Sequence, residues 1–426
     1  MYFFDRNDRF KNNIMLIDDQ AAEYTYEQVW DMGDELTAGY QERELVLLQC
    51  SNDVESVAAY LALLRKKCPV ILLGKDMEPA LAEAMRQTYR PGTDGEINPE
   101  LALLLSTSGS TGAQKLVRLS YDNLQSNCDS IVEYLGLTES ERPITTLPME
   151  YTYGLSVIHS HVAVGATIIL TNRTFFNKEF WDMIEEQKAT SIAGVPYSYE
   201  MLFNRLKLDE MDLPNLKTLT QAGGHLNPEL QERIGKWAKE TGRRFFVMYG
   251  QTEATARMSY IPPDRCLDKI GSIGIPVPGG KIELSEEGEL IYYGANVSLG
   301  YATCREDLAK PDENKGRLET GDIAYRDEEG YLYISGRKKR FIKLQGKRIS
   351  LDQIQEVLQE KVTEEIACTG KDDTGIIVWI AGKDREDEIL DLFRDTWGIR
   401  GRMVEIRTIE QIPRNTSGKI LYKDLK

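Results

Sequence analysis

Apolar and polar positions along the chain alternate between a helical period and short apolar runs. In the first part, two helical patterns, Tyr26 to Tyr40 and Val54 to Leu64, alternate with the apolar runs Leu45 to Leu48 and Val70 to Leu73. Helices between buried strands are typical of the βαβ units of a mostly parallel sheet. The same rhythm returns further along the chain, in a strand Leu101–Leu105, a helix Tyr121–Leu135 ended by Gly136, a strand Ala166–Leu170, a helix from Asn227 and Pro228 to Gly242, and a strand Phe245–Tyr249.

After Arg257 the pattern changes to short strands separated by glycine turns. The segments Lys281 to Leu284, Glu289 to Tyr292 and Tyr331 to Ile334 favour antiparallel hairpins in a small barrel or sheet. Beyond Gly336 a separate cycle follows, with a helix Leu351–Lys361, a strand Gly375–Ala381, a helix Arg385–Trp397 and a strand Met403–Thr408. We therefore predict an α/β protein with a large N-terminal domain over residues 1–338, a small α+β domain over residues 340–426, and a hinge near Lys339.

Composition and charge exclude several classes of protein. The 426 residues carry a formal charge of -16, which disfavours nucleic acid as the main partner. The apolar runs fall far short of the roughly 20 residues that a membrane-spanning helix needs. Charged residues interrupt the first eleven positions, where a secretory signal would need an apolar segment. The six cysteines are scattered, as expected for reduced thiols, so we expect a cytoplasmic protein.

The segment from Leu101 to Lys115 contains the first candidate chemistry. An apolar strand leads into a loop of hydroxyl and glycine residues, and a lysine ends the loop. Such a loop can wrap a polyphosphate, because glycine allows backbone N–H groups to converge and the lysine supplies a positive charge. It is not a Walker loop, since Gln114 and Leu116 stand where that motif needs Gly and Ser or Thr. Taken alone, the loop also fits a flexible surface segment.

Three further segments combine aromatic, acidic and basic residues next to strands or turns. The sequence Tyr249 to Glu253 offers a ring for a purine and a carboxylate for Mg²⁺. Asp322 can accept hydrogen bonds from ribose hydroxyls, with Arg337 to support it, and Lys419 lies on a glycine turn near the last residue given. Each of these residues taken singly also fits an ordinary turn or surface position.

Together and in this order, the four segments resemble the motifs of the adenylate-forming superfamily, which includes acyl-CoA synthetases, nonribosomal-peptide adenylation domains and luciferases. The resemblance extends from about Tyr24 to Leu425 and rests on STSGSTGxxK at 106–115, YGQTE at 249–253, TGD at 320–322 with GRKKRFIK at 336–343, and PRNTSGK at 413–419. The segment between Leu73 and Ser106 is shorter than in typical members, so the resemblance implies a shortened N-terminal subdomain. It also implies that the C-terminal domain is mobile about Lys339.

The resemblance implies an enzyme that uses ATP and Mg²⁺ to convert a carboxylate into an acyl-AMP and then passes the acyl group to a thiol. In that family the phosphate loop holds the β- and γ-phosphates, a role that would fall here to Thr107, Ser108, Gly109, Ser110, Thr111, Gly112 and Lys115. Tyr249 would stack on adenine in a nucleotide site that includes Gly224 and Gly250, and Asp322 with Arg337 would hold the ribose. The catalytic residues would be Thr252 beside the α-phosphate, Glu253 on Mg²⁺, and Lys419 between the acyl carboxylate and the α-phosphate.

One position of the acyl pocket that the resemblance implies restricts the class of carboxylic acid that the protein would use. The lining of this pocket would include Tyr151, Gly154, Tyr197 and Gly224. Amino-acid-activating members place an aspartate where Gly154 stands, and a buried ammonium without a counter-charge is costly. We therefore expect a small non-amino carboxylic acid, either fatty, aryl or hydroxy.

The thiol acceptor and two other functions stay open at this point. The acceptor is coenzyme A or the phosphopantetheine of a free acyl carrier protein, and the basic residues around Lys339 suit either. An amino-acid adenylation protein that serves a carrier is an alternative, which Gly154 weakens. A degenerate protein that binds a nucleotide or acyl-AMP without turnover is another. The retention of Lys115, Glu253, Asp322 and Lys419 together favours an enzyme.

Overall fold

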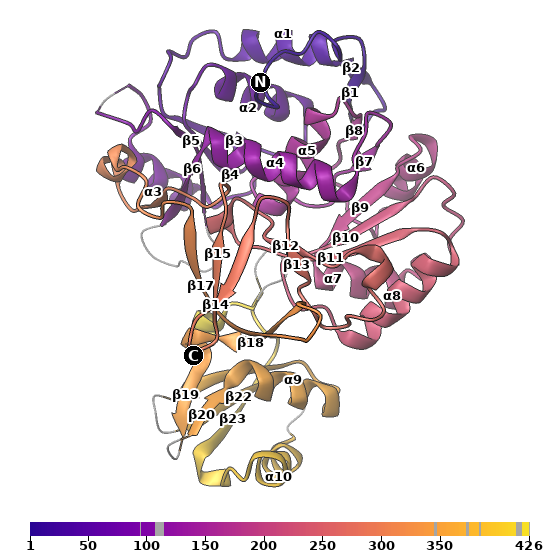
Figure 1. The fold of residues 1–426 in the computed structure, drawn as a ribbon, viewed down its shortest axis with the longest axis vertical. Helices are drawn as coiled ribbons and strands as arrows, with labels where there is room; N and C mark the ends of the chain where they lie inside the picture. Colours follow the sequence, from indigo (N-terminus) through magenta and orange to yellow (C-terminus); the bar gives the residue numbers. More distant parts are fainter. Residues whose placement is uncertain are drawn as a thin grey trace. The chain divides into compact units, whose positions relative to one another are not determined.

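The computed structural model describes residues 1–93, 95–106, 115–344, 347–371, 375–382, 385–414 and 420–425 (Figure 1). The chain divides into a larger unit, Met1–Ile282 with Tyr292–Leu318, and a smaller unit, Glu283–Ile291 with Glu319–Lys426. In the described residues, no helix combines the length and the apolar character needed to cross a membrane. The domain boundary and hinge near Lys339 remain predictions.

The larger unit contains a nine-stranded sheet in the order β13-β12-β11-β10-β9-β7-β8-β1-β2. Neighbouring strands from β11 through to β1 pair in parallel, and the strands at both ends of the sheet pair antiparallel. This mixture confirms the predicted α/β class. The strands are β1 (Ile14–Ile17), β2 (Glu23–Thr25), β7 (Pro143–Ile144), β8 (Ile168–Ile169), β9 (Ser191–Gly194), β10 (Thr218–Gln221), β11 (Arg244–Tyr249), β12 (Ser259–Tyr260) and β13 (Ile275–Pro276).

A second sheet of the larger unit carries the phosphate-loop segment. Its five strands run in the order β16-β6-β5-β4-β3, with β3 (Val46–Cys50), β4 (Val70–Gly74), β5 (Leu101–Ser106), β6 (Leu116–Ser120) and β16 (Gly300–Ala302). The strands β3, β4 and β5 are parallel, whereas β5–β6 and β6–β16 are antiparallel. The predicted helix Tyr121–Leu135 is confirmed as α4, but the strand β6 between the loop and this helix was not predicted. Strand β6 was missed because it runs into the next helix at Tyr121 without a turn residue.

Eight α-helices lie among the described residues of the larger unit, and local capping sets the ends of several of them. They are α1 (Tyr26–Leu36), α2 (Val54–Arg65), α3 (Pro79–Tyr89), α4 (Tyr121–Leu135), α5 (Thr152–Ala163), α6 (Lys178–Glu186), α7 (Pro196–Glu200) and α8 (Pro228–Glu240). Ser120 forms a capping box at the start of α4, and Gly136 ends it in the left-handed conformation. Figure 1 shows α7 and α8 beside strands β9 to β11. Side chains of α1, α2, α4 and α5 share one buried core with both sheets.

The division between the two units falls within a four-stranded sheet of order β14-β15-β17-β18. Its strands are β14 (Lys281–Leu284), β15 (Glu289–Tyr293), β17 (Arg317–Arg326) and β18 (Leu332–Arg337), and β17 pairs with β18 antiparallel. The remainder of the smaller unit has a hairpin β19 (Phe341–Leu344) and β20 (Lys347–Ser350), helices α9 (Leu351–Lys361) and α10 (Glu386–Trp397), and a sheet of β21 (Ile366–Lys371), β22 (Gly375–Ala381) and β23 (Val404–Ile409).

Candidate functional site

Two of the predicted motifs meet at a third side chain, Tyr301 of β16. Lys115 comes directly before β6, and its Nζ lies 3.1 Å from the centroid of the Tyr301 ring. The Tyr301 hydroxyl donates a hydrogen bond of 2.8 Å to Oε1 of Glu253, which lies in a short 3-10 helix after β11. The structure therefore brings together the lysine predicted for phosphate and the carboxylate predicted for Mg²⁺. Tyr301 was not predicted as a site residue, since none of the four motifs includes it.

The backbone around Tyr301 is fixed by a buried arginine. Tyr301 is opposite Val117 in the antiparallel pair of β16 and β6. The fully buried Arg118 donates to the carbonyl oxygens of Tyr301 and Leu299 at 3.1 and 2.8 Å, and forms an ion pair of 2.6 Å with Glu313. Burial, together with the Glu253 carboxylate, raises the pKa of the Tyr301 phenol. The phenol therefore stays protonated at neutral pH and acts as the donor to Glu253.

Tyr249 is the last residue of β11, and the tight loop that follows presents Thr252 and Glu253. All three side chains are partly exposed. Asn296 holds this loop, because its side-chain amide donates to the carbonyl oxygens of Ala254 and Arg257 at 2.9 and 3.2 Å. The backbone N–H of Ser298 also donates to the Glu253 carbonyl at 2.9 Å. The position of the Glu253 side chain thus depends on a loop with several independent anchors.

Gly250 allows this loop to close on itself. A Cβ atom at Gly250 would collide with the carbonyl oxygen of Ala256 and would come within 2.8 Å of the Cα atom of Arg257. We predict that Gly250→Ala destabilises the protein by about 3 kcal/mol, because the backbone itself would have to move. Thermal unfolding should measure this change, with the exposed Gly39→Ala as the control. A Cβ at Gly39 meets nothing within 4 Å, and a similar loss in both variants would contradict the explanation.

Three of the four residues predicted for the acyl pocket lie around the ends of β9 and β10. The Tyr151 hydroxyl oxygen would lie 2.6 Å from a Cβ atom at Gly223, so the phenol packs against the glycine pair that includes Gly224. Pro196 approaches a Cβ position at Gly224 to 3.1 Å, and the adjacent Tyr197 is 49% exposed. Burial raises the pKa of Tyr151 to about 12, so its hydroxyl is neutral at physiological pH. These side chains could form one wall of a substrate site.

Gly154 lies instead inside the first turn of α5. A Cβ atom there would collide with the carbonyl oxygen of Pro148 and would lie 2.9 Å from that of Leu147. The neighbouring Tyr153 is buried and donates 2.8 Å hydrogen bonds to the carbonyl and the hydroxyl of Thr220. Close packing alone therefore explains the glycine. The same packing leaves no room for an acidic side chain at position 154.

The smaller unit brings together the pair predicted for ribose. Asp322 and Arg337 are opposite one another in the β17–β18 pair, and Arg337 Nε lies 3.2 Å from Asp322 Oδ1. The Asp322 side chain is 4% exposed and that of Arg337 62% exposed. Lys339 is exposed in a 3-10 turn, Lys338–Arg340. The predicted residues Thr107, Ser108, Gly109, Ser110, Thr111, Gly112 and Lys419 lie outside the described residues.

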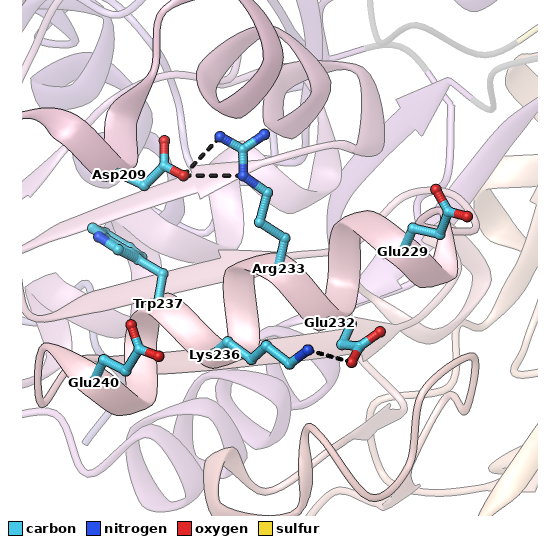
Figure 2. Close-up of a pocket in the computed structure, with 7 residues that line it drawn as sticks. All are labelled: Asp209, Glu229, Glu232, Arg233, Lys236, Trp237 and Glu240. Carbon is cyan, nitrogen blue, oxygen red and sulfur yellow. Dashed lines mark hydrogen bonds and ion pairs between the residues drawn. The ribbon is translucent and has the colours of Figure 1, made fainter.

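A hollow on the outer face of α8 contains none of the predicted site residues. Figure 2 shows charged side chains and Trp237 around it, with Asp209 ion-paired to Arg233 at 2.7 Å and Glu232 to Lys236 at 2.6 Å. Neighbouring charges of opposite sign are thus already paired on this surface. Across the part of the chain that the structure describes, no three His, Cys, Asp or Glu side chains cluster as metal ligands.

Known proteins resemble this chain in both sequence and fold. The chain is 29% identical over 334 residues to the 2-succinylbenzoate–CoA ligase of Listeria innocua, covering 76% of this chain and 69% of the relative. It is 28% identical over 354 residues to the indoleacetate–CoA ligase of Aromatoleum aromaticum, covering 78% and 68%.

Two solved structures share the fold. One is the O-succinylbenzoate coenzyme A synthetase of Bacillus subtilis with AMP, with a TM-score of 0.81, 20% identity, and coverage of 97% of this chain and 95% of that one. The other is ATP-bound MatB of Rhodopseudomonas palustris, with a TM-score of 0.83, 20% identity, and coverage of 99% and 97%. The sequence profile of the AMP-binding enzymes matches residues 67–302, more than half of the 426 residues. The chain therefore belongs to the family of AMP-binding enzymes.

Proposed function

We propose that this protein is an AMP-forming ligase that activates an aryl carboxylic acid and transfers the acyl group to coenzyme A. The observation that carries the proposal is the convergence of Lys115 and Glu253 on Tyr301 in a member of the AMP-binding family. The proposal gives the phosphate and metal roles to the larger unit. It gives the ribose role to Asp322 and Arg337 of the smaller unit.

The first half-reaction is a displacement at the α-phosphorus of ATP. A carboxylate oxygen of the acid forms a bond to phosphorus, the bond to the β-phosphate oxygen breaks, and pyrophosphate leaves. Such a step needs positioning and charge neutralisation more than a protein nucleophile. The ammonium of Lys115 and, by resemblance, that of Lys419 would neutralise phosphoryl charge, while Thr252 would lie near the α-phosphate.

The residues present fit a magnesium ion that is shared with the ATP phosphates. Mg²⁺ prefers oxygen ligands and is commonly bound by one or two carboxylates together with substrate phosphates. Glu253 supplies such a carboxylate on an anchored loop at partial exposure. Bound there, the metal would neutralise negative charge on the phosphates.

The names of the relatives support the choice of acid and acceptor. The two relatives described above are named for aryl-containing acids, 2-succinylbenzoate and indoleacetate. Both are named as CoA ligases, which favours coenzyme A over a carrier protein as the acceptor.

We predict that aryl acids support ATP–pyrophosphate exchange and that standard α-amino acids do not. The experiment is an exchange screen over aryl, fatty, hydroxy and amino acids, repeated for thioester formation with coenzyme A and with a phosphopantetheinylated carrier protein. Strong exchange with an α-amino acid would show an amino-acid adenylation protein instead. ATP binding without exchange for any acid would show a nucleotide-binding protein without turnover.

A further inference from the structure

We propose that Tyr301 is a positioning residue for adenylation, whose ring places the Lys115 ammonium and whose hydroxyl orients the Glu253 carboxylate. This inference rests on the proposed function, because it concerns how the phosphate and metal groups are prepared for Mg-ATP. The sequence motifs do not include Tyr301, and its two contacts come from the fold alone.

The two contacts of Tyr301 use different parts of the side chain. The Lys115 Nζ atom lies 3.1 Å from the ring centroid, whereas the hydroxyl lies 2.8 Å from Glu253 Oε1. The tyrosine offers each of these charged groups a neutral contact, the ring face to Lys115 and the hydroxyl to Glu253. Contacts with a neutral phenol are weaker than a charge pair, so phosphate and metal can replace them.

The position of Tyr301 is coupled to that of Lys115 through the sheet. Lys115 leads into β6, and Tyr301 is opposite Val117 of that strand. Arg118, the next residue of β6, donates from its Nε to the Tyr301 carbonyl at 3.1 Å. The strand that follows Lys115 therefore also holds the backbone of Tyr301. The Tyr301 ring therefore holds the Lys115 ammonium in one position before any ligand binds.

Gly300, the residue before Tyr301, allows β16 to lie this close to Arg118. Gly300 has a φ of +118°, which favours glycine, and a Cβ atom there would lie 2.5 Å from Glu313 Oε2 and 3.0 Å from Arg118 Nη2. The same arginine that holds Tyr301 thus leaves no space for a side chain at position 300. Gly300 and Arg118 thus fix the backbone of Tyr301, whose side chain contacts Lys115 and Glu253.

Two substitutions separate the two contacts. Tyr301→Phe keeps the ring for Lys115 and removes the hydrogen bond to Glu253, whereas Tyr301→Leu removes both. We expect Tyr301→Phe to weaken Mn²⁺ binding in the presence of ATP by about tenfold, since a hydrogen bond to a charged group is lost. We expect Tyr301→Leu also to weaken ATP binding without a metal. Tyr293→Phe is the matched control, because Lys281 Nζ lies 5.8 Å from that ring in the same unit.

The experiment measures Mn²⁺ binding by electron paramagnetic resonance and ATP binding by calorimetry, both without any acid, and records thermal unfolding of each variant. If the hydroxyl acts through Glu253, Tyr301→Phe should weaken Mn²⁺ binding no further when it is added to Glu253→Gln. Unchanged Mn²⁺ affinity in a folded Tyr301→Phe would overturn the proposal. If no acid supports exchange by the wild-type protein, the proposed function fails, and the binding comparison still decides the role of Tyr301.

Discussion

Replacing Glu253 by glutamine is expected to slow acyl-AMP formation by about 100-fold or more while the protein stays folded. The amide keeps the size of the side chain and an oxygen that can accept the 2.8 Å hydrogen bond from Tyr301. It removes the negative charge that would bind Mg²⁺. The clustered charge on the ATP phosphates would then lack a fixed counter-ion in the transition state.

Acid-dependent ATP–pyrophosphate exchange measures this loss, and thermal unfolding monitors the fold. Glu306→Gln is the matched control, because Glu306 belongs to the same unit, is 70% exposed and pairs with Arg90 at the surface. We expect this control to retain nearly wild-type exchange. Exchange near the wild-type rate in Glu253→Gln would assign Glu253 to the structure of the loop and not to the metal.

The second large effect is expected at Lys419. Lys419→Ala should abolish acyl-AMP formation, because the transferring phosphoryl group would lose its cation. It should largely spare thioester formation from acyl-AMP that is supplied ready-made. Lys371→Ala serves as a control in the same unit, since Lys371 is exposed and pairs with Glu405 at 2.6 Å.

A proline at the predicted hinge should reverse this pattern. Arg337 donates its backbone N–H to Asp352 at 3.0 Å, and Arg340 pairs with the same carboxylate, so the turn between them is anchored on both sides. Lys339→Pro fixes φ inside this turn and should hinder a rotation needed for thioester formation, with less effect on adenylation. Both half-reactions are to be measured separately in both variants. Equal losses in the two half-reactions of each variant would refute domain alternation.

The elements that were predicted correctly are those with capping residues at their ends in the sequence. Helix Tyr121–Leu135 has a capping serine before it and a left-handed glycine after it, and the structure confirms its bounds. Helix α5 was not predicted, because Thr152 to Val162 are buried without interruption and give no amphipathic pattern. Strand β6 was missed for a related reason, since it is buried throughout and its last residue, Ser120, is also the N-cap of α4.

In the candidate site, too, the residues within short motifs were predicted, whereas a contact between distant parts of the chain was not. Asp322 and Arg337 were singled out together, and a hairpin between them makes them cross-strand partners. Lys115 and Glu253 were found through motifs, but nothing in the sequence showed that they share a neighbour. Tyr301 lies 48 residues from Glu253, and its contacts exist only because β16 pairs with β6. The role of such a residue can be recognised only from the folded structure.

The acyl-adenylate route itself is tested most directly with an acid whose carboxylate carries oxygen-18. When the carboxylate attacks the α-phosphorus and the thiol of coenzyme A later attacks the acyl carbon, a carboxylate oxygen leaves with AMP. Mass spectrometry of the nucleotide, pyrophosphate and thioester follows that oxygen. We predict AMP that carries a single oxygen-18 in its phosphate, together with unlabelled pyrophosphate. Label in inorganic phosphate, with ADP as the nucleotide product, would contradict the account.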